Sequence, residues 1–193
     1  MSFARYIGLA VPFALTAGPA LAHAGSGAHN HGLFAGFMHP IGGLDHVLAM
    51  VAVGLFASLL GGRARWAVPA SFIVMMVLGG ALGMVGGEVP AIEVGITLSI
   101  IVLGAVVALG KSWSVGVAMA LVGVFAVFHG YAHGTEMPAG TGALAYSVGF
   151  AVATTLLHVT GLLFGLLTTG RYTQGVRVAG AATAVAGILL AIA

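Results

Sequence analysis

Two short clusters of histidine and carboxylate side chains interrupt an otherwise apolar sequence. The first reads HPIGGLDH over residues 39–46, and the second reads FHGYAHGTE over residues 128–136. Residues four apart lie on the same face of a helix, so the spacing of His129 and His133 points both imidazoles the same way. Glu136 shares this face if the helix continues that far. Imidazole nitrogens and carboxylate oxygens suit a borderline divalent ion, so the pattern predicts a site for Ni²⁺, Zn²⁺, Cu²⁺, Co²⁺ or Fe²⁺.

The first cluster also predicts a break in the backbone. Pro40 and the two glycines that follow it disfavour a continuous helix, and broken helices inside membranes line cavities. The first membrane span therefore either begins near Leu33 and kinks at Pro40, or begins near Leu44 after a short interfacial segment. Asp45 is either a hard oxygen ligand or the carboxylate that holds the tautomer of the neighbouring imidazole of His46.

The predicted metal ligands are six residues of these clusters, and five further residues are weaker candidates. The six are His39, Asp45, His46, His129, His133 and Glu136, and the weaker ones are His158, Glu93, His23, His29 and His31. His158 falls near the middle of a span, where it is either a hydrogen-bond donor between helices or a relay ligand. Glu93 lies one turn into the third span. The three remaining histidines precede the first span, in either a flexible polar leader or a weak metal-collecting arm.

Composition places these clusters in a membrane protein. Of the 193 residues, 60% are hydrophobic and only 5% are charged, and the mean hydropathy is +1.15. Soluble domains carry roughly 25% charged residues, so a soluble enzyme, a nucleic-acid-binding protein and a disordered chain are excluded. The absence of cysteine excludes disulfides and thiolate metal sites. The partners that remain are the lipid bilayer and a divalent metal ion.

The first 22 residues have the pattern of a cleavable signal peptide. Arg5 supplies a positive charge, an apolar stretch follows, and Ala20-Leu21-Ala22 matches the small-x-small cleavage pattern. We predict cleavage after Ala22, a histidine-containing periplasmic tail over residues 23–32, and a transmembrane domain over residues 33–193.

Six apolar runs predict an all-α membrane protein, a compact bundle of six transmembrane helices. They cover residues 44–60, 66–85, 91–109, 113–131, 143–167 and 175–192. The basic residues after the signal peptide all fall on one side of this topology: Arg63, Arg65, Lys111, Arg171 and Arg177. The positive-inside rule makes this side cytoplasmic. It predicts a multi-pass protein of the cytoplasmic (inner) membrane, with both mature termini and both clusters on the periplasmic side.

Glycines spaced four apart predict close helix packing. Examples are Gly79 and Gly83 in the second span, and Gly130 and Gly134 in the fourth. Close packing limits any internal path to a narrow one, which suits a small ion.

At its two clusters the sequence resembles the HupE/UreJ family of nickel permeases. Members have an HPxxGxDH-type motif at the first span and an FHGxAHGxE-type motif at the fourth, and residues 39–46 and 128–136 match both in full. The resemblance implies uptake of Ni²⁺, and of Co²⁺ in some members, for the maturation of nickel enzymes such as hydrogenase or urease. It also makes cytoplasmic nickel chaperones candidate partners. The residues alone predict only a divalent-metal site, with Zn²⁺ also open.

The favoured hypothesis is inward transport by channel-like facilitated diffusion. The metal ion is then the transported substrate, and the protein is not an enzyme and needs no organic cofactor. The chain has no Walker A motif, which argues against direct use of ATP. The alternative is an intramembrane zinc-dependent hydrolase with Glu136 or Asp45 as the base. A haem protein is disfavoured, because axial ligands must come from opposite faces and His129 and His133 share one. The sequence does not predict the oligomeric state.

Overall fold

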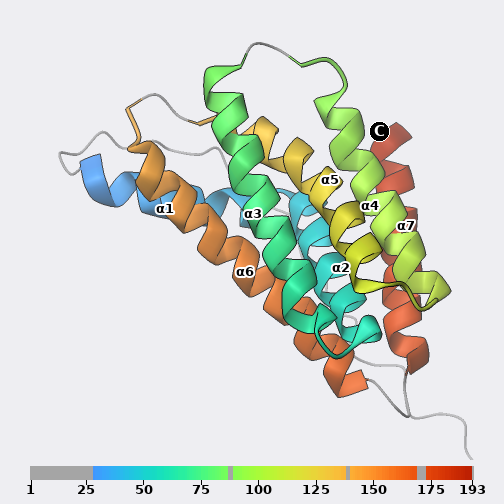
Figure 1. Cartoon of the computed structure of the whole chain (residues 1–193). Helices are drawn as coiled ribbons and strands as arrows, with labels where there is room; N and C mark the ends of the chain where they lie inside the picture. Colours follow the sequence, from blue (N-terminus) through green and yellow to red (C-terminus); the bar gives the residue numbers. More distant parts are fainter. Residues whose placement is uncertain (1–27, 87–88, 138–139, 169–172, 193) are drawn as a thin grey trace, which may run out of the picture.

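Seven helices contain nearly all of the residues that the structure, a computed structural model, describes (Figure 1). These residues are 28–86, 89–137, 140–168 and 173–192. The helices are α1 (Ala28–Gly42), α2 (Leu44–Leu60), α3 (Ala64–Val85), α4 (Ile92–Leu109), α5 (Val115–Thr135), α6 (Ala143–Thr168) and α7 (Thr173–Ile192). The described part of the chain has no strand, in agreement with the all-α prediction.

Helices α3 to α7 are each long and apolar enough to cross a membrane. The α1–α2 pair passes the same test only when taken together, and its two helices are bent by 82° at the break between them. The described residues therefore contain five candidate spans, or six if the bent pair counts as one. This indicates a multi-pass membrane protein, and the predicted number of six corresponds to the second count.

The break in the first span lies at Gly43. This residue has an extended backbone, with φ −101° and ψ 120°, and α2 begins directly after it at Leu44. Pro40 lies inside the last turn of α1, where a missing backbone donor weakens the helix close to its end. The predicted start near Leu44 is therefore the start of α2, and α1 is a separate helix of 15 residues.

The predicted signal peptide, its cleavage point and His23 lie outside the described residues. Helix α1 begins at Ala28, so His29 and His31 belong to its first turns. Residues 28–32, which we predicted to belong to the N-terminal tail, are thus helical.

Glycines allow the backbones of α3 and α5 to touch. A Cβ on Gly79 or Gly83 would overlap a carbonyl oxygen of α5, and a Cβ on Gly130 or Gly134 would overlap a carbonyl oxygen of α3. The two pairs spaced four apart therefore interlock, as expected of small residues at a membrane helix interface. This contact fixes the rotation of α5 about its own axis, and with it the direction in which the histidines of α5 point.

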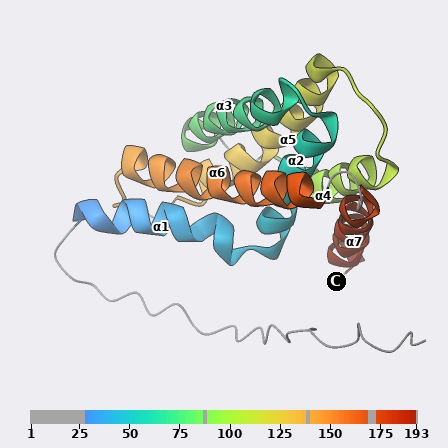
Figure 2. The same cartoon turned by 90° about the horizontal axis from the view of Figure 1, so that it is seen from below.

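Helices α1 and α2 both pack against α6, one after the other. Figure 2 shows α1 running alongside α6 before the chain turns sharply into α2. A Cβ on Gly36 of α1 would overlap the carbonyl oxygen of Tyr146, and a Cβ on Gly161 of α6 would overlap that of Val51 in α2. These contacts keep α1 beside the first half of α6 and α2 beside its second half.

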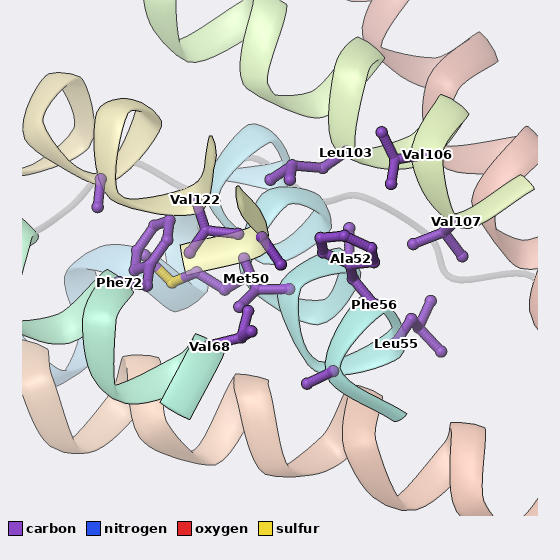
Figure 3. Packing of buried hydrophobic residues seen from close by; sticks show 14 of the residues in the cluster. Met50, Ala52, Leu55, Phe56, Val68, Phe72, Leu103, Val106, Val107 and Val122 are labelled. Carbon is purple, nitrogen blue, oxygen red and sulfur yellow. The ribbon is translucent and has the colours of Figure 1, made fainter. Parts of the chain in front are cut away.

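The apolar core is centred on α2, which contacts each of the other helices (Figure 3). Met50 and Phe56 of α2 pack with Phe72 of α3, Leu103 of α4 and Val122 of α5, and all five are fully buried. Many large apolar side chains on the outside of the bundle stay exposed, which suits a lipid environment.

Basic side chains gather at one end of the bundle. The α2–α3 and α4–α5 connections and the start of α7 share the lower end in Figure 1. Arg63 precedes α3, Lys111 follows α4, and Arg177 lies near the start of α7. Arg177 Nε donates a hydrogen bond to the carbonyl oxygen of Ala108 at 2.8 Å, at the C-terminal end of α4. The end of α5 and the start of α6 lie at the opposite end of the bundle.

Candidate metal centre

Three segments bring the six main candidate ligands into one site. His39 comes from the last turn of α1, Asp45 and His46 from the first turn of α2, and His129, His133 and Glu136 from the C-terminal end of α5. The ring centroid of His46 lies 5.1 Å from that of His129 and 4.5 Å from that of His133. The rings of His39 and His133 are 4.7 Å apart. Because α5 continues to Thr135, its two histidines face the broken span together.

His46, His129 and His133 form a buried group, which we call the inner triad. Each residue is at most 9% exposed, and one nitrogen from each lies within 4.8 Å of the others. Among the described residues, Nε2 of His46, Nδ1 of His129 and both nitrogens of His133 have no hydrogen-bond partner. Buried polar atoms are normally hydrogen-bonded, so three close imidazoles that each keep an unpaired nitrogen fit a borderline divalent ion.

Asp45 holds the imidazole of His46. Its Oδ1 lies 2.8 Å from Nδ1 of His46, so the carboxylate accepts a hydrogen bond from Nδ1–H and leaves Nε2 free. A Cβ on Gly43 would lie 2.6 Å from the Asp45 oxygen and 2.7 Å from the His46 nitrogen, so a larger residue would displace this pair. Of the two roles predicted for Asp45, the geometry favours the carboxylate that orients a metal-binding imidazole.

Asp45→Asn is expected to weaken metal binding by roughly 10- to 100-fold, the usual effect of losing the partner of a metal-binding imidazole. The amide has nearly the same shape, but its NH₂ group can face Nδ1 and so favour the tautomer with the proton on Nε2 of His46. Calorimetric titration of the purified protein with Ni²⁺ measures the effect, and circular dichroism verifies that the helices are retained. An unchanged affinity would contradict this role of Asp45.

His39, His133 and Glu136 form a second and more exposed group, which we call the outer group. Oε2 of Glu136 lies 3.4 Å from Nε2 of His39 and 3.9 Å from Nδ1 of His133. The side chain of Glu136 is 50% exposed, that of His39 is 32% exposed and that of His133 is 5% exposed. Because His133 belongs to both groups, the ligand atoms form a continuous series from an exposed carboxylate to the buried triad.

The ends of three helices shape the electrostatics of this site. His39 and His133 lie in the last turns of α1 and α5, where the helix dipole presents its negative end and favours a cation. Helix α2 begins at the same place and presents its positive end. The carboxylate of Asp45, in the first turn of α2, offsets that charge.

Glu93 lies apart from both metal groups but lines a cavity that also reaches Glu136 of the outer group. A cavity of about 1200 Å³, which we call the vestibule, is lined by the end of α3, the start of α4 and the end of α5. Glu93 and Glu136 both line it, together with Tyr131. The weaker candidate of the sequence is thus a second carboxylate on the approach to the outer group, and it is not a member of either group that could hold an ion.

His158 is also separate from the two groups. It is 2% exposed in α6, and neither of its ring nitrogens has a hydrogen-bond partner among the described residues. The ring of Phe72 lies 5.1 Å from the ring of His158 and 5.8 Å from that of His129. The buried ring of Phe72 therefore lies close to both His158 and one member of the inner triad.

Two contacts of the site were missed by reasoning from the sequence. Oγ of Ser99, in α4, lies 2.8 Å from Nε2 of His129, and the ring of Phe150, in α6, lies 4.2 Å from that of His133. The sequence offered one weak indication of Ser99: between Glu93 and Leu109, only Thr97 and Ser99 carry a hydroxyl group. A helical serine usually satisfies its own hydroxyl group with a nearby carbonyl, so this signal does not stand out. Nothing in the local pattern distinguishes Phe150.

Comparisons with known proteins agree with the two motifs. The family model described as HupE / UreJ protein matches residues 11–190. A protein named Protein HupE, from Rhizobium leguminosarum bv. viciae, is 44% identical over 189 residues, which cover 97% of this chain and 99% of that protein. No solved structure matches the chain. Since both similarities extend over almost the whole sequence, the chain belongs to the HupE/UreJ family.

Proposed function

We propose that this protein carries a divalent transition-metal ion, Ni²⁺ first of all, across the cytoplasmic membrane into the cell. The observation that carries the proposal is the inner triad, in which three buried imidazoles from α2 and α5 each bring a nitrogen within 4.8 Å of the others. Each of these rings also has a nitrogen without a hydrogen-bond partner among the described residues. Imidazole ligands favour Ni²⁺, Co²⁺ or Zn²⁺ over Mg²⁺ and Ca²⁺, which prefer oxygen. We prefer nickel among these ions because the chain belongs to the HupE/UreJ family. Its resemblance to the nickel permeases of this family implies a supply of Ni²⁺ for enzymes such as hydrogenase or urease.

The ion's route follows the gradient of burial at the site. A hydrated ion enters the vestibule, where the carboxylates of Glu93 and Glu136 attract it. The outer group replaces part of its water, and His133, which belongs to both groups, passes it to the inner triad. The route then leads past Phe72 and His158 toward the end of the bundle that carries the basic residues.

The proposed orientation places the vestibule in the periplasm and the basic end in the cytoplasm. The positive-inside rule supports it, and so does the predicted signal peptide, whose removal leaves the mature N-terminus outside. The C-terminus is then also periplasmic. In the cytoplasm the ion is taken over by nickel chaperones, which keep its free concentration low.

The membrane potential is the proposed source of energy. A divalent ion that moves inward gains about 4.6 kcal/mol per 100 mV, since each charge contributes ~2.3 kcal/mol. This is enough to sustain facilitated diffusion without ATP.

Uptake of radiolabelled nickel into sealed proteoliposomes tests the proposal. We expect saturable uptake that rises with an inside-negative potential, competition by Co²⁺ or Zn²⁺, and no competition by Mg²⁺. Liposomes without protein provide the baseline. Tight nickel binding without flux at any potential would contradict transport and would favour a static metal site, as in the hydrolase alternative.

Glu93→Gln is expected to raise the nickel concentration needed for half-maximal uptake about fivefold at low ionic strength. Removing one carboxylate from the vestibule lowers the attraction of the ion by ~1 kcal/mol, the size expected for charges near water. The maximal rate should stay unchanged, because Glu93 belongs to neither metal group.

Glu93→Asp, which keeps the charge, is the matched control for this measurement and should behave like the wild type. Added salt should reduce the difference between Glu93→Gln and the wild type. Equal half-saturation of the two proteins at low salt would contradict an electrostatic role for Glu93.

A further inference from the structure

Ser99 contacts the inner triad from α4, a helix that contributes no ligand to either metal group. Its side chain is fully buried, and its Oγ lies between two partners. The carbonyl oxygen of Ile96 is 2.5 Å away, and Nε2 of His129 is 2.8 Å away. The transport route proposed above does not use this residue.

The hydroxyl group has one hydrogen, and the geometry decides where it points. A carbonyl oxygen can only accept, so the short contact between Ser99 and Ile96 requires the serine to donate. If the hydrogen pointed to His129 instead, two oxygen atoms would face each other at 2.5 Å without a hydrogen between them. Ser99 Oγ therefore donates to Ile96 and accepts from His129 Nε2–H.

This arrangement determines the tautomer of His129. With the proton on Nε2, Nδ1 carries the free lone pair, and Nδ1 is the nitrogen that is buried without a hydrogen-bond partner among the described residues. We infer that Ser99 is a positioning residue, which holds His129 as the Nε2–H tautomer and so presents Nδ1 as the metal ligand. The inference rests on the metal-binding role proposed for the triad.

The tautomer of His46 is also determined by a hydrogen-bond partner, which is a different kind of group. There a carboxylate accepts from Nδ1–H and leaves Nε2 free, whereas at His129 a neutral hydroxyl group accepts from Nε2–H and leaves Nδ1 free. Metal-binding histidines commonly depend on such partners for their tautomer and orientation. Two of the three imidazoles are thus oriented before an ion arrives, each through a hydrogen bond at the ring nitrogen opposite the unpaired one.

Nitrogen NMR of the metal-free wild-type protein tests the tautomer directly. The protein is labelled with ¹⁵N-histidine and studied in detergent micelles at mildly alkaline pH, and the His129 signals are assigned by their loss in His129→Gln. We expect a proton on Nε2 and a bare Nδ1. A predominant Nδ1–H form would overturn the inference, and this measurement needs no variant of Ser99 to fold.

Three variants separate positioning from simple packing. Ser99→Ala removes the acceptor and should give a mixture of His129 tautomers, with a roughly 10- to 100-fold loss of Ni²⁺ affinity. Ser99→Thr keeps the hydroxyl group and should restore the single tautomer and most of the affinity.

Ser58→Ala is the matched control. Ser58 is also buried and donates to a carbonyl oxygen three residues earlier, that of Leu55 at 2.6 Å, but it contacts none of the triad. Its removal should leave the His129 tautomer unchanged and the affinity within about a factor of two of the wild type, because Ser58 belongs to neither metal group.

The outcomes also separate this inference from the proposed function. A single Nε2–H tautomer and unchanged affinity in Ser99→Ala would overturn the positioning role. The expected tautomer with nickel binding but no flux would contradict transport and support the inference. A wild-type protein that binds no nickel would overturn both.

Discussion

Replacing His133 with alanine is expected to abolish nickel uptake while the protein still folds in the membrane. His133 is the residue that the inner triad and the outer group share. Its loss removes one of three buried imidazoles and also disconnects Glu136 and His39 from the deeper site. We expect Ni²⁺ affinity to fall by more than the roughly 100-fold that loss of an orienting partner can cost, and uptake into proteoliposomes to drop to the baseline of protein-free liposomes.

His158→Ala is the control with the same chemical change in a similarly buried position. His158 lies outside both metal groups, so this variant should keep the wild-type affinity for Ni²⁺ even if it alters the rate of transport. Circular dichroism and gel filtration in detergent verify that both proteins are folded. Normal uptake by a folded His133→Ala protein would contradict the assignment of the triad.

Gly130→Ala is expected to disrupt the bundle, although it changes no ligand. A Cβ at this position would overlap the carbonyl oxygen of Met76 in α3, and a backbone atom cannot move aside as a flexible side chain can. Overpacking of this kind typically costs ~1–3 kcal/mol, and here it separates α5 from α3. Because His129 and His133 lie on either side of Gly130 in the sequence of α5, the displacement should also misplace the triad.

Thermal unfolding in detergent measures this effect, and Gly116→Ala is the matched control. Gly116 belongs to the same helix, but a Cβ there would meet nothing within 4 Å. Alanine is intrinsically the better helix former by ~1 kcal/mol, so Gly116→Ala should be neutral or slightly stabilising. The Gly130→Ala protein should unfold at a clearly lower temperature and bind nickel weakly. Equal melting temperatures for the two variants would show that α3 and α5 do not depend on this contact.

Local patterns in the sequence predict the helices and place the candidate metal ligands on them. Apolar runs bounded by glycine, proline or charge are a local signal, and residues 44–60 are both the predicted span and the observed α2. The spacing of His129 and His133 is also local, because residues four apart share a helix face wherever the helix lies. The sequence therefore predicts imidazole and carboxylate ligands and a borderline divalent ion, and both stay predictions.

Which candidate ligands lie together depends on how the helices pack. Residues 39–46 and 128–136 are far apart in the sequence, and their contact depends on glycines that let α3 reach α5 and let α1 and α2 reach α6. The choice between two roles for Asp45 depended on a 2.8 Å distance. The separation of Glu93 and His158 from the metal groups, and the contact of Ser99 with His129, follow from how neighbouring helices are rotated. Helix periodicity specifies which residues share a face, but packing between helices specifies what each face meets.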